Sequence, residues 1–158
     1  MRYSELEVEI GRLVAAAPEH GVRAFGADTV TRLARADRLD DADEDELTED
    51  AWAALTGACA NVLTIGAGEL RRALTTIDEG ILADGDLDTE VVAVISALEH
   101  WQGYLEGDGR DQIRELALRA IEDVDHEVSA ALDDFLAAPE VAAEYARLRR
   151  FLAPRAER

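Results

Sequence analysis

The sequence predicts an all-α fold, an irregular or up-down bundle of six to seven helices in a single domain over residues 1–158. Apolar residues recur at intervals of three and four, which places them along one face of a helix. Only 3 prolines and 11 glycines interrupt the chain, and β-branched residues never alternate over the length of a strand. Aromatic residues make up 5% of the chain, so alanine and leucine must fill much of the core.

Two helices are expected before residue 37. Ser4-Glu5-Leu6-Glu7 has the form of a capping box, which predicts Ser4 as the N-cap of the first helix. Pro18 ends that helix or begins the next one, over residues 20–36, which Gly26 and Asp28 could divide. The predicted core positions of these helices are Leu6, Ile10, Leu13, Val14, Val22, Phe25, Val30 and Leu33.

An acidic run follows from Asp37 to Asp50, and we predict a solvated loop there because dense like charges oppose compaction. Thr48 should cap a helix that contains Trp52 and Cys59 and ends at residues 66–68. The next helix is expected over residues 69–81, before a second acidic hinge over residues 84–88. The alternating aspartates of both acidic segments resemble the start of a calcium loop. Neither segment has the required glycine and glutamate at the sixth and twelfth positions.

The clearest helical periodicity comes after the second hinge. It is formed by Val91, Val94, Ile95, Leu98, Trp101 and Leu105. Gly107-Asp108-Gly109 should end this helix, and the next one extends to about Leu136. Pro139 suits the first position of a last helix, which Pro154 ends. We expect the aromatic residues Trp52, Trp101, Tyr104, Phe135 and Phe151 to anchor the core, with an interface role for one or two as the alternative.

The formal net charge of −19 excludes the function classes that need a basic surface. Such a chain repels nucleic-acid phosphates and anionic lipid, so we expect no nucleic-acid and no membrane binding. It suits a basic protein partner, although acidity also serves solubility. All 16 basic residues are arginine, and those near the C-terminus, such as Arg147, are expected to pair with surrounding acids. A lone cysteine and no apolar run at residues 1–5 predict a cytoplasmic protein.

No residue pattern predicts catalysis or a cofactor. Cys59 lies on an apolar stripe, where a thiol keeps a high pKa and stays inert. The weak candidates for a metal site are His100, Glu122 and His126, since helical bundles bind metals through inward-facing histidines and carboxylates. His126 is expected on a polar face opposite Val124, and His100 at the boundary of its stripe.

The pattern Pro139-x-Val141-x-x-Glu144-Tyr145 resembles the closing motif of the YjaG-like family, small all-helical bacterial proteins of unknown function. The preceding order is similar too, with a helix pair, a helix bearing Trp52, an aspartate-rich turn near residue 86 and a helix with Ala97-Leu98. This chain departs from the family at Ala53, where an acid is usual, and in a shorter link before Pro139. The resemblance implies the fold over most of the chain and no catalytic residue.

These observations favour a non-catalytic module that binds another protein, for example an acidic inhibitor or immunity-type protein for a basic toxin or nuclease. The predicted partner-binding residues are Asp40, Asp41, Asp43, Glu44, Asp45, Glu46, Glu49 and Asp50. A metal-binding bundle or metal-dependent enzyme is the alternative. A self-associating scaffold, such as a homodimer, is a further one.

Overall fold

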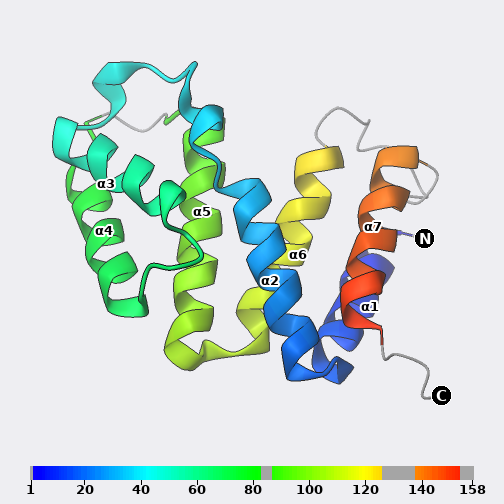
Figure 1. Ribbon diagram of the computed structural model, residues 1–158. Coiled ribbons are helices and arrows are strands. Elements are labelled where there is room, and N and C mark those ends of the chain that lie inside the picture. Colours follow the sequence, from blue (N-terminus) through cyan, green and yellow to red (C-terminus); the bar gives the residue numbers. More distant parts are fainter. Residues whose placement is uncertain (1, 83–86, 126–137, 154–158) are drawn as a thin grey trace. The chain divides into compact units, whose positions relative to one another are not determined.

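The computed structural model describes residues 2–82, 87–125 and 138–153, and these residues form seven α-helices and no strand (Figure 1). The helices are α1 Tyr3–Ala16, α2 Glu19–Leu33, α3 Glu49–Ala60, α4 Ala67–Glu79, α5 Thr89–Gly103, α6 Arg110–Asp125 and α7 Pro139–Leu152. Two short 3₁₀-helices, η1 Ala36–Leu39 and η2 Glu44–Glu46, lie before α3, and a π-helical turn, η3 Tyr104–Asp108, follows α5. The predicted all-α class and number of helices are confirmed.

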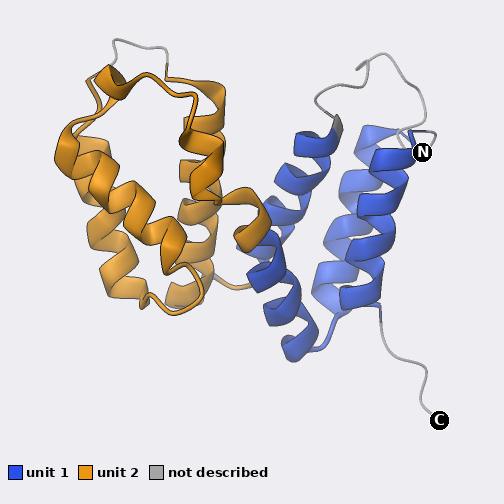
Figure 2. Cartoon of the chain, turned by 45° about the horizontal axis from the view of Figure 1, so that its top comes forward, with its two compact units in different colours: residues 1–29, 110–158 blue, residues 30–109 orange. Residues whose placement is uncertain are grey.

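The chain divides into two compact units, which Figure 2 colours separately. Unit 1 combines residues 1–29 with residues 110–158, and unit 2 is residues 30–109. One boundary therefore lies inside α2 and the other directly after Gly109, so unit 2 is inserted between the two halves of unit 1. The assignment of residues 1–158 to a single domain stays a prediction.

In unit 1, α1 contacts both α6 and α7, and α6 also contacts α7. The core positions predicted on α1 and α2 are all buried. The prediction that Ser4 caps α1 is wrong, because the helix begins at Tyr3 and Glu5 Oε1 accepts a hydrogen bond from the backbone N–H of Arg2 at 3.3 Å. The alternative that α2 divides at Gly26 and Asp28 is wrong as well. The carboxylate of Asp28 binds Arg147 instead of capping the backbone, and α2 continues through it.

Arg147 is the most enclosed charged group described in unit 1, with 6% of its side chain exposed. Its guanidinium donates to Asp28 Oδ2 at 2.6 Å, to Glu144 Oε1 at 2.9 Å and to the hydroxyl of Thr29 at 3.0 Å. The guanidinium carbon also lies 5.0 Å from the centre of the Phe25 ring. This set of contacts joins α7 to α2 and satisfies a charge that would be costly to bury alone.

In unit 2, α3 packs against α4 and α4 against α5, while η1 contacts α5. Thr48 caps α3 as predicted, with its hydroxyl oxygen accepting from the backbone N–H of Ala51 at 3.2 Å. Leu47 and Ile81 form a single antiparallel β-bridge, so the end of α4 lies beside the acidic segment. Arg38 donates to Glu90 at 2.6 Å and to the carbonyl of Leu33 at 3.0 Å, which ties η1 to α5 and to the end of α2.

The remaining predictions have mixed outcomes. Pro139 is the first residue of α7, and Gly107 and Gly109 adopt φ values of 97° and 72°, in the region that favours glycine, at the end of η3. The loop expected over residues 37–50 instead contains η1 and η2, because Leu39 and Leu47 are buried and fix its backbone. The predicted features at residues 84–86, 126–136 and 154–155 lie outside the described residues.

Replacement of the enclosed arginine, Arg147→Ala, should lower the free energy of unfolding by about 3–5 kcal/mol, because the buried carboxylate of Glu144 would lose its counter-ion. The control Arg150→Ala removes an exposed arginine of the same helix and should change stability by no more than about 0.5 kcal/mol. Urea unfolding followed by circular dichroism measures both. Equal losses for the two variants would contradict the role of the Arg147 contacts.

Glycine-to-alanine changes in unit 2 should have opposite signs at two positions. A Cβ at Gly80 would lie 2.5 Å from both Ala51 Cβ and Thr48 Oγ1, so Gly80→Ala should destabilise the chain by about 1–3 kcal/mol. A Cβ at Gly57, inside α3, meets nothing within 4 Å, so Gly57→Ala should stabilise it by about 0.5–1 kcal/mol. Thermal melts of the two variants test this, and a stabilised Gly80→Ala chain would refute the close approach of α4 to α3.

Candidate functional site

The acidic segment predicted to bind a partner, residues 40–50, is largely on the surface of unit 2. Seven of its eight predicted binding residues are exposed, and Glu46 is half-buried. Glu46 Oε1 accepts from the backbone N–H of Asp88 at 2.7 Å, and its Oε2 is buried without a hydrogen-bond partner. Glu46 is therefore engaged inside unit 2, whereas the other seven carboxylates face solvent.

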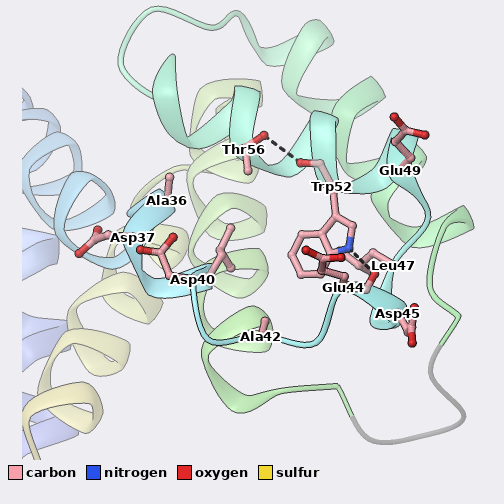
Figure 3. A pocket seen from close by; sticks show the side chains of 11 residues that line it. Ala36, Asp37, Asp40, Ala42, Glu44, Asp45, Leu47, Glu49, Trp52 and Thr56 are labelled. Atoms are coloured by element: carbon pink, nitrogen blue, oxygen red, sulfur yellow. Dashed lines mark hydrogen bonds between the residues drawn. The ribbon is translucent and has the colours of Figure 1, made fainter.

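A groove with a volume of ≈ 860 Å³ lies between residues 36–47 and α3, and we call it the acidic groove (Figure 3). Its lining consists of Ala36, Asp37, Leu39, Asp40, Ala42, Glu44, Asp45, Leu47, Glu49, Trp52 and Thr56. Trp52 and Thr56 are four residues apart on α3 and so lie on one face of that helix. The acidic groove includes four of the predicted binding residues. Asp41, Asp43 and Asp50 do not line it.

Trp52 provides the aromatic surface of the acidic groove. It is half-exposed rather than fully buried, so it is not the simple core anchor that the sequence favoured. Its indole Nε1 donates to the backbone carbonyl of Glu44 at 2.9 Å, which fixes the ring against the acidic segment. Trp101 does anchor the core, since it is 3% exposed and its Nε1 donates to the carbonyl of Val62 at 3.1 Å.

Few of the negative charges of the acidic groove are neutralised by basic side chains of the described residues. Asp37 pairs with Arg35 at 3.6 Å. No basic side chain of the described residues forms an ion pair with Asp40, Glu44, Asp45 or Glu49. Arg38, which lies just before this segment, is bound to Glu90 and to the Leu33 carbonyl. A concave surface lined by charges of one sign focuses the field and attracts counter-charged ligands.

Figure 3 shows how the groove's polar side chains are arranged. Asp40 lies on the wall formed by residues 36–42, while Trp52 and Glu44 lie across from it. Glu49 and Asp45 point outward at the rim. The groove therefore has an aromatic ring with Glu44 beside it, and Asp40 on the facing wall and the rim residues add further negative charge.

The weak metal candidates lie in different parts of the chain. His100 is half-buried on α5 in unit 2. Glu122 is exposed on α6 in unit 1, where it accepts from the hydroxyl of Tyr3 at 2.8 Å and contacts Arg119 at 3.4 Å. His126 lies outside the described residues. Within residues 2–82, 87–125 and 138–153, no three histidine, cysteine, aspartate or glutamate side chains form a group that could hold a metal ion.

Cys59 is buried on α3, as its apolar stripe predicted. Burial raises the pKa of its thiol from 9.0 to about 11, because the thiolate is disfavoured away from water. The thiol therefore offers little nucleophile at neutral pH.

Alkylation tests that pKa. At pH 8, iodoacetamide should modify Cys59 in the folded chain roughly a hundredfold more slowly than in urea, since a pKa raised by burial lowers the thiolate fraction. The rate for the folded chain should rise with pH until the pH approaches the raised pKa. Mass spectrometry of quenched samples follows the reaction. Equal rates for the folded and unfolded chains would show that the thiol is exposed and ionised normally.

Among the described helices, none has the length and apolar character required to cross a membrane. No family model, curated protein or solved structure matches this chain. Its resemblance to the YjaG-like family stays a prediction.

Proposed function

We propose that this chain is a non-catalytic, cytoplasmic protein-binding module whose acidic groove docks a basic segment of another protein. The observation that supports the proposal is the set of four groove carboxylates, Asp40, Glu44, Asp45 and Glu49, that form no ion pair with a described basic residue. Carboxylates gathered around a concave surface repel one another, and a cationic partner relieves that repulsion.

An inhibitor or immunity-type role follows from the same chemistry. Basic toxins and nucleases use positive surfaces to bind nucleic acid, and a protein with a net charge of −19 is attracted to such surfaces. Complementary charge speeds association and makes it sensitive to salt. When the partner docks in the groove, its basic surface would be covered and could not bind nucleic acid.

Affinity capture from a lysate of the source cells tests the proposal with two matched variants. The groove variant neutralises Asp40, Glu44, Asp45 and Glu49 as asparagine or glutamine. The control variant makes the same change in charge at Asp78, Glu99, Asp111 and Glu140, which are exposed and do not line the groove.

We expect the unaltered chain and the control variant to recover the same basic protein at low salt. The groove variant should bind this protein roughly fourfold or more weakly, since four exposed ion pairs contribute about 0.2–1 kcal/mol each. High salt should weaken the binding of the basic protein to the unaltered chain and to both variants. Recovery of no basic protein would contradict the proposed function, and equal recovery by both variants would place the binding surface elsewhere.

A further inference from the structure

The acidic groove has the chemistry to distinguish arginine from lysine, and this inference rests on the proposed function. We propose that the groove takes an arginine side chain of the basic partner segment, with the guanidinium against the indole of Trp52 and beside Glu44, while Asp40 on the facing wall adds negative charge. Three features of the chain support this proposal: the kinds of groups in the groove, the way in which Trp52 is held, and the environment of Arg147.

The groove presents an aromatic ring together with carboxylates, and a guanidinium matches both. Arginine is planar, is weakly hydrated and donates several hydrogen bonds in a fixed fork, so it can stack on a ring and bind carboxylates at the same time. A lysine ammonium is compact and strongly hydrated, so it gains less from the ring. At ≈ 860 Å³ the groove has room for more than one side chain, which suits an arginine presented within a segment of a partner.

Trp52 is positioned before any ligand arrives. The hydrogen bond from its Nε1 to the carbonyl of Glu44 fixes the ring and at the same time holds Glu44 next to it. A ring that is already ordered loses little conformational freedom on binding, which favours affinity. The bond also occupies the only polar atom of the indole, so the ring is left to contact a ligand through its apolar faces and edges.

In unit 1 of the same chain, an arginine occupies a site that is likewise formed by aromatic rings and carboxylates. There the guanidinium of Arg147 lies 5.0 Å and 5.9 Å from the ring centres of Phe25 and Phe151, and it binds the carboxylates of Asp28 and Glu144. The combination is aromatic surface, two carboxylates and one enclosed arginine. The acidic groove repeats the aromatic surface and the carboxylates, and no arginine of the described residues pairs with those of Asp40 and Glu44.

Binding of three synthetic peptides to the full chain tests the inference. The peptides are octa-arginine, octa-lysine and octa-citrulline, the last having nearly the shape of arginine without its charge. Calorimetry at physiological salt gives the affinities. A change in tryptophan fluorescence on peptide binding reports mainly on Trp52, because Trp101 also emits but is buried away from a ligand.

We expect octa-arginine to bind roughly three- to thirtyfold more tightly than octa-lysine, the range that a cation–π contact of about 0.5–2 kcal/mol provides, and octa-citrulline not to bind. Trp52→Leu should reduce the affinity for octa-arginine to that for octa-lysine and leave the affinity for octa-lysine unchanged. Trp52→Phe should keep part of the preference for octa-arginine over octa-lysine. The double variant Asp40→Asn with Glu44→Gln should weaken the binding of both peptides. Both positions are exposed, so this variant is less disruptive to folding than replacement of Trp52.

Each other outcome overturns the inference. If octa-arginine and octa-lysine bind equally and Trp52→Leu has no effect, the groove recognises charge alone, and the proposed function survives without the arginine preference. If Asp40→Asn with Glu44→Gln weakens binding no more than the control variant with Asp78, Glu99, Asp111 and Glu140 neutralised, the peptides bind elsewhere on the acidic surface. If neither basic peptide binds, the arginine site is refuted, and recovery of the basic protein from lysate decides the proposed function separately.

Discussion

Each unit of this acidic chain encloses an arginine whose charge has to be satisfied. A buried charge is tolerated only when it is paired and hydrogen-bonded, and here each unit satisfies one guanidinium with groups from separate segments. Arg147, 6% exposed, joins α7 to Asp28 and Thr29 of α2 in unit 1. Arg38, 7% exposed, joins η1 to α5 and to the Leu33 carbonyl at the end of α2 in unit 2. Arg147 thus binds side chains of α2 in unit 1. Arg38 binds the last backbone carbonyl of α2 in unit 2, where a positive charge also interacts favourably with the helix dipole.

Periodicity predicted most of the helices, whereas details that depend on distant contacts were missed. The stripe of Leu6, Ile10, Leu13 and Val14 is buried as expected, because helical spacing alone fixes which face is apolar. The start of α1 was misplaced by two residues, since the spacing of Arg2 and Glu5 competes with that of Ser4 and Glu7. Tyr3 also binds Glu122, 119 positions away, and no local pattern shows such a bond. The sequence predicted that Arg147 pairs with acids. Its enclosure against Phe25 and Asp28 of α2 depends on contacts far away in the sequence, so no local pattern shows it.

The candidate site was predicted as a charge pattern but not as a shape. Eight acids expected on one surface separate into four that line the groove, three outside it and Glu46, which binds the backbone of Asp88. The concavity arises because 3₁₀ turns at η1 and η2 bury Leu39 and Leu47 and bend the segment around Trp52. The sequence does place Trp52 four residues after the cap Thr48, so its position on α3 could be predicted. Its bond to Glu44 could not, because that bond depends on the path of the intervening turn.

The insertion of unit 2 between the halves of unit 1 has a consequence during translation. Residues 1–29 emerge from the ribosome before all of residues 30–109, and only then does α6 follow. At about 5–20 residues per second, synthesis from the end of α1 at Ala16 to the end of α6 at Asp125 takes roughly 5–22 s, and the apolar face of α1 stays uncovered by α6 during this time. Unit 2 is contiguous and needs no such delay. Synthesis therefore favours completion of the acidic unit first, and the nascent α1 is open to chaperones until α6 and α7 arrive.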